Sequence, residues 1–174
     1  MSEKILVTYA SRTGTTESVA QVIGKNLIES GAVVDVLPMQ SVLDLSPYAA
    51  VIAGSAIRKS KWLPEAQQFI LAHRTELAGK PFAMFTVCIT LAMSQSEQYL
   101  SAVKGWVSPV RELVRPVSEG FFPGLLDFGK LPFSWDTMML WLSVAIGIFP
   151  RGDRRDWKAV QAWTTELKSI LLAL

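Results

Sequence analysis

The stretch KILVTYASRTGTT at residues 4–16 decides the fold of this chain. Its first part, Lys4 to Tyr9, is a short run of mostly apolar and β-branched residues and predicts a buried strand. Small polar residues follow, and from Thr15 to Glu29 apolar side chains recur at helical spacing until Gly31, a residue type that commonly ends helices. The sequence therefore predicts a strand that enters a helix through one short loop.

The rest of the chain continues this alternation of strands and helices. Further strands are predicted over residues 33–37, 48–55, 81–90 and 116–126, and further helices over residues 64–78, 96–114 and 156–172. Gly105 and Pro109 predict an interruption in the second of these helices. The alternation implies βαβ units and a mostly parallel sheet covered on both faces. We predict a doubly wound, three-layer α/β/α fold with five strands in the order 2-1-3-4-5, whose ligand lies beyond the carboxyl ends of strands one and three.

The loop Ser11-Arg12-Thr13-Gly14-Thr15-Thr16 has the composition of an anion-binding site. The first turn of a helix has unpaired N–H groups and a partial positive charge, the glycine lets the backbone approach closely, and the hydroxyls donate hydrogen bonds. The loop has neither a Walker lysine nor a G-x-G-x-x-G pattern, so it favours a phosphate monoester over nucleoside triphosphates and dinucleotides. The alternative is that these residues are ordinary helix caps.

The composition of the chain limits the classes of protein to which it can belong. Half of the 174 residues are hydrophobic and 18% are charged, which excludes intrinsic disorder and fits one domain over residues 1–174. The formal net charge is +2, with both signs spread along the chain, so no nucleic-acid partner is expected. Cys88 is the only cysteine, and the N-terminal apolar stretch is too short for a secretory signal. We therefore expect a cytoplasmic protein.

The spacing Ser11-x-Thr13-Gly14-x-Thr16 resembles the S/T-x-T-G-x-T fingerprint of the flavodoxin family. The order of strands and helices extends this resemblance over nearly the whole chain. The resemblance implies a flavodoxin-like fold and one non-covalently bound FMN, whose phosphate lies in this loop. It also implies that the flavin ring lies against the loops after strands three and four.

The loop after strand three combines small, basic and aromatic residues. Ser55 and Ala56 would let the backbone come close to the ring, and Ile57 or Trp62 would lie against it. Reduced flavin carries negative charge near N1, which the cation of Arg58 would stabilise. The alternative is a solvated basic loop in which Trp62 packs as a lid.

The loop after strand four is expected to offer backbone groups to the polar edge of the ring, through Thr86, Val87, Cys88 and Ile89. Without a second cysteine, Cys88 is interpreted as a small buried hydrophobe and not as a redox thiol. His73 is the only histidine, so neither a metal site nor a Ser-His-Asp triad is expected. We assign no catalytic residue.

An apolar segment at residues 131–149 lies within an insertion at about residues 127–155, before the last helix. Its uncharged part is shorter than the ~20 apolar residues that a membrane span needs. One interpretation is a helix packed on the sheet or in a homodimer interface. The other is a helix at a bilayer surface or against a lipophilic molecule, flanked by the cations Lys130, Arg151, Arg154 and Arg155.

This insertion, the run Gly54 to Arg58 and the pair Asp156-Trp157 resemble the flavodoxin-fold, quinone-dependent protoporphyrinogen dehydrogenases. That resemblance implies an FMN oxidoreductase that passes electrons from protoporphyrinogen to a quinone. If the apolar segment is an interfacial helix, we expect the protein to lie at the inner face of the membrane. The alternative is a flavodoxin-type electron carrier without a small-molecule substrate, although flavodoxins are typically acidic and this chain is slightly basic. A third possibility is a flavin-free domain whose loop binds another phosphate or a protein.

Overall fold

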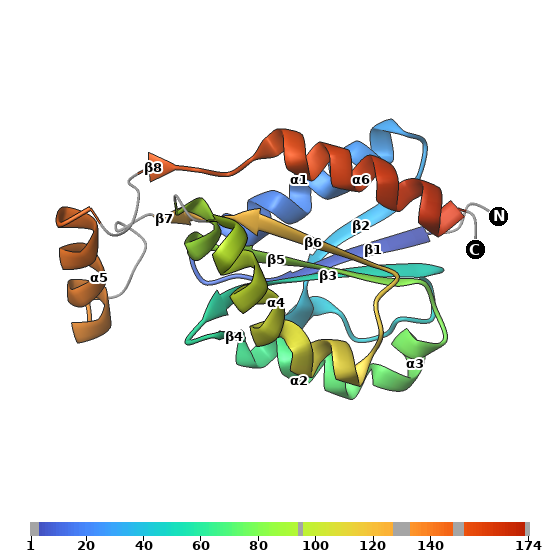
Figure 1. Ribbon diagram of the computed structural model, residues 1–174. Helices are drawn as coiled ribbons and strands as arrows, with labels where there is room; N and C mark the ends of the chain where they lie inside the picture. Colours follow the sequence, from blue (N-terminus) through green and yellow to red (C-terminus); the bar gives the residue numbers. More distant parts are fainter. Residues whose placement is uncertain (1–3, 94–95, 127–132, 148–151, 173–174) are drawn as a thin grey trace.

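The central sheet of the protein is parallel and has its strands in the order β2-β1-β3-β5-β6 (Figure 1). The computed structural model describes residues 4–93, 96–126, 133–147 and 152–172. In sequence order the strands are β1 (Lys4–Ala10), β2 (Val33–Pro38), β3 (Ala50–Arg58), β5 (Phe82–Cys88) and β6 (Ser118–Pro123). The predicted doubly wound sheet and its strand order 2-1-3-4-5 are therefore confirmed.

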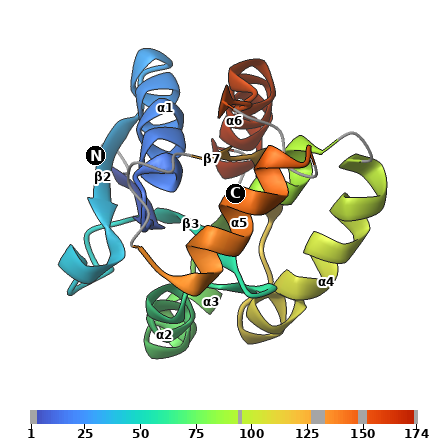
Figure 2. The same cartoon turned by 90° about the vertical axis from the view of Figure 1, so that its left-hand side faces the viewer.

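Helices cover both faces of this sheet, so the fold has the three predicted layers (Figures 1 and 2). One face is covered by α1 (Thr15–Glu29) and α6 (Trp157–Leu172), and the other by α2 (Pro64–Ala72), α3 (Arg74–Ala78) and α4 (Ser96–Leu113).

Neighbouring residues of each strand point to opposite faces, and this alternation builds two apolar cores. In β1, Leu6 and Ala10 join the core under α2 and α4, whereas Ile5 and Val7 join the core under α1 and α6. The strands are apolar on both sides because neither face of the sheet meets water.

Several boundaries differ from those that the sequence predicts. The third strand begins at Ala50 and continues to Arg58, because a two-residue turn leads into β4 (Lys61–Trp62), which pairs with its end. The helix predicted over residues 64–78 divides at His73, whereas α4 runs through Pro109 without the predicted break. Short 3-10 turns follow β2 and β5, at Met39–Ser41 and Ile89–Ala92.

The insertion begins and ends in a small antiparallel pair, β7 (Leu125–Leu126) and β8 (Gly152–Asp153). Between them lies α5 (Trp135–Ala145), whose first turn is capped by Ser134, since its hydroxyl accepts from the amide of Thr137 at 3.3 Å. In Figure 1, α5 stands beyond the carboxyl ends of the central strands. Both ends of the predicted apolar segment, with Lys130 and Arg151, lie outside the described residues. The assignment of residues 1–174 to one domain stays a prediction.

Candidate functional site

A pocket of about 370 Å³ opens at the carboxyl ends of β1, β3 and β5, where the strand order reverses. Five segments contribute most of it: the loop between β1 and α1, the end of β3, the end of β5 with the turn that follows, the segment after β6, and the inner side of α5. Figure 2 shows α5 lying across this end of the sheet. The pocket is lined by Ser11, Arg12, Thr13, Thr15, Ala56, Ile57, Arg58, Lys59, Leu63, Val87, Ile89, Gly124, Leu125, Asp136, Thr137 and Leu140.

The loop from Ser11 to Thr16 places the uncapped N-terminus of α1 beside this pocket. Gly14 is the N-cap of α1 and has a φ of 83°, a left-handed conformation that glycine adopts without steric cost. Its carbonyl accepts the first helical bond from the Ser18 amide at 3.0 Å, and its own amide donates to the Ser11 hydroxyl at 3.0 Å. No side chain caps the helix at Gly14. The hydroxyls of the loop are thus not the ordinary helix caps that the alternative interpretation requires.

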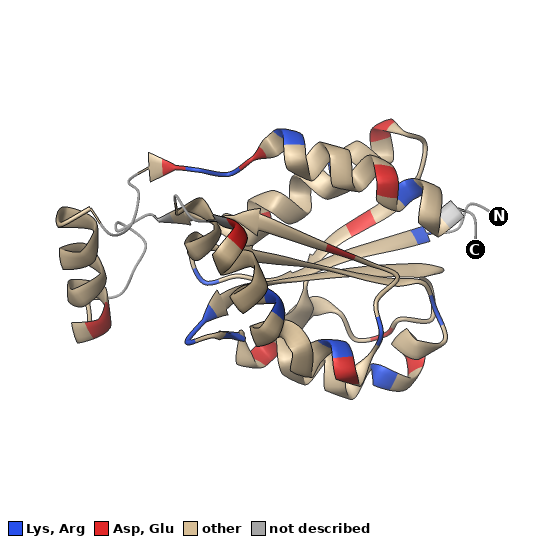
Figure 3. Ribbon diagram, viewed as in Figure 1, with Lys and Arg blue, Asp and Glu red and all other residues tan. Residues whose placement is uncertain are grey.

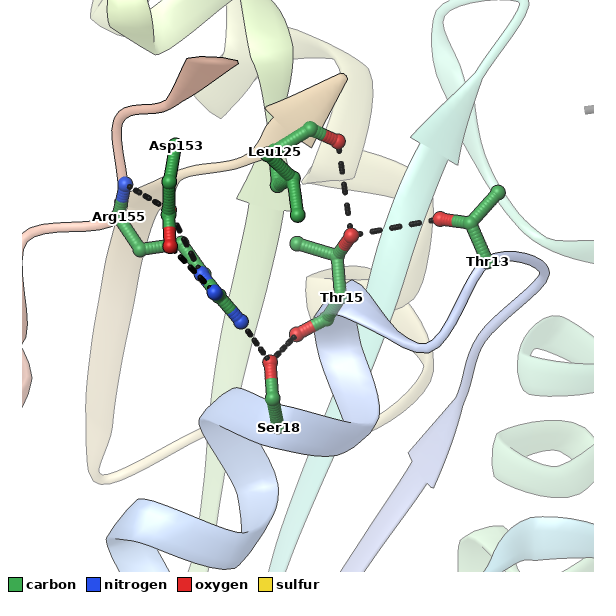
Figure 4. Close-up of polar contacts among 6 residues, drawn as sticks. All are labelled: Thr13, Thr15, Ser18, Leu125, Asp153 and Arg155. Carbon is green, nitrogen blue, oxygen red and sulfur yellow. Dashed lines mark hydrogen bonds and ion pairs between the residues drawn. The ribbon is translucent and has the colours of Figure 1, made fainter. Parts of the chain in front are cut away.

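The threonines of the loop have few partners of their own (Figure 4). The hydroxyl of Thr15 lies 3.3 Å from that of Thr13 and 3.5 Å from the carbonyl oxygen of Leu125 on β7, a long contact. Thr16 is fully buried, and its hydroxyl has no hydrogen-bond partner among the described residues. Buried hydroxyls nearly always have a partner, so the first turn of α1 holds an unsatisfied hydrogen-bond donor.

A cation from the far end of the chain lies beside the first turn of α1. Arg155 donates from Nη1 to the hydroxyl of Ser18 at 2.7 Å, and Ser18 donates to the carbonyl of Thr15 at 2.7 Å (Figure 4). Arg155 also forms an ion pair with Asp153 of β8, which holds the pKa of that carboxyl below its usual value. The base of the insertion is thereby fastened to the loop. The sequence did not reveal this contact because 137 positions separate Arg155 from Ser18.

Cations also line the outer rim of the pocket. Arg12 is half exposed and forms an ion pair with Glu65 of α2 at 3.0 Å. Arg58 and Lys59 are exposed and form no ion pair with any residue that the structure describes. Their hairpin turns through Lys59 and Ser60, both with positive φ, as two-residue hairpin turns require. The pocket therefore carries free positive charge on the β3 side.

Six of the residues predicted to bind the cofactor do not line the pocket. Trp62 is buried beneath it, and its indole nitrogen donates to the hydroxyl of Thr86 at 2.9 Å, so Trp62 does not lie against a ligand in the pocket. The hydroxyl of Ser55 accepts a hydrogen bond from the amide of Leu63 at 3.1 Å. The six residues are Gly14, Thr16, Ser55, Trp62, Thr86 and Cys88.

Several side chains predicted to contact the cofactor are instead buried in the two cores. Ser55, Thr86 and Cys88 lie on strands whose side chains alternate between the two cores, so their polar groups turn inward. Burial raises the pKa of the Cys88 thiol, which fits its interpretation as an inert buried residue. Lining residues that the sequence did not reveal come mainly from the insertion and its base: Gly124, Leu125, Asp136, Thr137 and Leu140.

Two other features bear on the chemistry of the protein. Across the described ranges, no group of three or more His, Cys, Asp or Glu side chains is placed to hold a metal ion. None of the helices in those ranges is both long and apolar enough to cross a membrane.

Comparison with known proteins agrees with the fold. Residues 6–147 match the family model described as a flavodoxin domain. No curated protein sequence was found to match the chain. The flavodoxin of Streptococcus pneumonia TIGR4 is 17% identical with a TM-score of 0.59, covering 96% of this chain and 99% of that one. Flavodoxin 2 of Bacillus cereus is 20% identical with a TM-score of 0.55, covering 96% and 99%. A Fusobacterium nucleatum flavodoxin mutant bound to flavin mononucleotide is 15% identical with a TM-score of 0.53, covering 98% of both chains. At these identities the likeness is one of fold.

Proposed function

The chain belongs to the flavodoxin domain family, and from that membership and the geometry of the pocket we propose that it binds one FMN non-covalently and transfers electrons. FMN, when bound, supplies the electron-accepting chemistry. The start of α1 would hold the phosphate, and the ends of β3 and β5 would line the part of the pocket that takes the ring. The proposal has precedent in the Fusobacterium nucleatum flavodoxin mutant, whose structure contains flavin mononucleotide.

The observation that carries this proposal is the uncapped start of α1 beside the pocket, whose lining includes the hydroxyl residues Ser11, Thr13 and Thr15. A phosphate oxygen is an acceptor for the first-turn amides and for these hydroxyls. The pocket volume of about 370 Å³ lies within the range of small-molecule sites. Ala56 and Ile57 at the end of β3, with Val87 at the end of β5 and Ile89 just after it, supply a mainly apolar lining for the ring.

The test is a titration of the flavin-free protein with FMN and, separately, with riboflavin, which has the same ring but lacks the phosphate. Flavin fluorescence reports binding of both. If the loop holds the phosphate through two or more charge-assisted hydrogen bonds, FMN binds at least about 100-fold more tightly than riboflavin. Equal affinities would refute the phosphate site, and no binding of either flavin would refute the flavin site.

A second candidate function is a quinone-linked dehydrogenase, with protoporphyrinogen as the first donor to test. The favouring observation is that Asp136, Thr137 and Leu140 of α5 line the pocket together with Arg58 and Lys59, two cations that form no ion pair in the described ranges. Cations there would stabilise the anionic, fully reduced flavin and so favour two-electron chemistry over one-electron transfer.

A redox titration separates the two candidates. A low potential for the second electron and a well-populated one-electron-reduced flavin support the carrier. Anaerobic bleaching of the bound flavin by protoporphyrinogen, followed by reoxidation with a quinone, supports the dehydrogenase. The Arg58→Gln variant distinguishes them further, because it lowers the second potential only where this cation faces the reduced ring. The cytoplasmic location stays a proposal in either case.

A further inference from the structure

Helix α5 has one face that is buried or lines the pocket and one face that is exposed. Thr137 and Leu140 line the pocket and Val144 is buried, so these three define the inward face. The outward face consists of apolar side chains spaced three or four positions apart, which are 40% to 70% exposed: Trp135, Met138, Met139, Leu142 and Ile146. A surface helix in water shows the reverse pattern, so this outward face lacks its partner.

The outward face also carries no charge. Asp136 is the only charged residue of α5, and it lines the pocket. Figure 3 accordingly shows α5 as a tan helix with a single red residue at its start. An exposed surface this apolar, with tryptophan and methionine side chains, is typical of contact with lipid or another protein.

Unpaired cations surround this end of the molecule. Arg58, Lys59 and Lys61 are exposed on the hairpin of β3 and β4, and Arg154 is exposed just after β8. None of the four forms an ion pair with a residue in the described ranges. Arg58 and Lys59 line the same pocket as Thr137 and Leu140, so positive charge lies close to α5.

We propose that the outward face of α5 docks on an anionic lipid bilayer, with its apolar side chains in the headgroup region and the neighbouring cations on the lipid phosphates. An interfacial helix binds through this combination of buried apolar area and attraction to anionic lipid. At 11 residues, α5 is about 16 Å long, so it lies on the surface.

A second copy of the chain is a poorer occupant of this face. A symmetric dimer through α5 would bring the hairpin cations of both copies together, which like charges oppose. One helix about 16 Å long and about 10 Å wide also falls short of the roughly 800 Å² per partner of a standard interface. The same positive charge that disfavours the dimer attracts anionic headgroups.

The test is co-sedimentation of the full chain with two kinds of vesicle, phosphatidylcholine alone and phosphatidylcholine mixed with phosphatidylglycerol. The chain is expected to partition onto the mixed vesicles and to be released as salt rises. Leu142→Glu is expected to weaken this partition at least about tenfold, because it replaces inserted apolar surface by a charge. Lys61→Gln is expected to weaken it about fivefold.

Leu43→Glu is the matched control, since Leu43 is 89% exposed and lies outside α5. This variant is expected to partition like the unaltered chain, and circular dichroism with thermal unfolding verifies that all variants fold. Absence of binding to the mixed vesicles would overturn the proposal, as would equal binding by Leu142→Glu. A concentration-dependent dimer that Leu142→Glu dissolves, without vesicle binding, would assign the face to a second copy instead. Lipid partition is read independently of flavin binding, so failure here leaves the FMN site untouched.

Discussion

Replacing Thr16 by valine is expected to stabilise the flavin-free protein and weaken FMN binding at the same time. The two side chains have nearly the same shape, so the substitution removes the hydroxyl and leaves the packing of α1 in place. In the flavin-free protein that hydroxyl is buried, with no hydrogen-bond partner in the part of the chain that the structure describes. With FMN bound, we propose that it donates to the phosphate.

The expected magnitudes follow from this change of environment. Burying an unsatisfied hydroxyl costs about 1–3 kcal/mol, so Thr16→Val should raise the free energy of unfolding of the flavin-free protein by about that amount. In a chain of this size, each 1 kcal/mol raises Tm by about 2–4 °C. A hydrogen bond to a charged acceptor contributes about 1.5–3 kcal/mol, so its loss should weaken FMN binding about 10- to 150-fold.

The assay pairs thermal unfolding of the flavin-free protein with FMN titration of the same sample. Thr8→Val is the matched control: like Thr16, Thr8 is fully buried, does not line the pocket and has a hydroxyl without a partner among the described residues, but it lies within β1 and not in the first turn of α1. It should give a similar rise in Tm and leave FMN affinity unchanged. The reasoning is refuted if Thr16→Val lowers Tm, or if both variants weaken FMN binding to the same degree.

Three further predictions concern the scaffold of the site. Gly54→Ala should destabilise the protein by about 3 kcal/mol in urea unfolding, because the new Cβ would lie 2.0 Å from the ring of the fully buried Phe85; a value within error of zero would contradict this packing. Ser60→Gly should stabilise the protein by about 0.5–1 kcal/mol, since it relieves the positive φ of 58° in the β3–β4 turn, and any loss of stability would show that the serine has another role. Burial and the Asp35 carboxylate raise the pKa of Tyr48 from 10.0 to about 12. Between these two pH values the folded state keeps the phenol proton, whereas the unfolded state loses it. The free energy of unfolding should therefore fall as the pH rises from 10 towards 12. Tyr48→Phe should lack that component of the decline, and parallel pH profiles for the two proteins would rule it out.

Patterns local in sequence determined most of the fold. The apolar run at residues 4–9 and the helical spacing from Thr15 predicted β1 and α1 almost to the residue, because both follow from periodicity over short windows. The alternation of strands and helices then left few topologies open, since parallel strands need right-handed helical crossovers. The position of the loop from Ser11 to Thr16 at the carboxyl ends of the strands follows from the same alternation.

The interior polar groups were less predictable. Trp62 and Thr86 are polar or amphipathic residues next to predicted loops, which made them candidates for ligand contact. In the structure the indole nitrogen of Trp62 donates a hydrogen bond to the hydroxyl of Thr86 at 2.9 Å inside the core. The face to which a strand residue points depends on where the strand begins and ends. The end of β3 was hard to predict because the β3–β4 turn, at Lys59 and Ser60, contains neither the glycine nor the asparagine that is typical of such turns.

By itself, the sequence determined the order of the strands, the loop that leads into α1 and the presence of an apolar helix in the insertion, because each depends on residues near one another in the chain. Only the tertiary structure decided which way that helix faces, placing Leu140 over the pocket and Leu142 towards the outside. It also decided that Arg155 reaches Ser18, and that the hydroxyl of Thr16 is left without a partner. These features depend on contacts between distant segments, whose geometry is fixed only when the two cores close around the sheet.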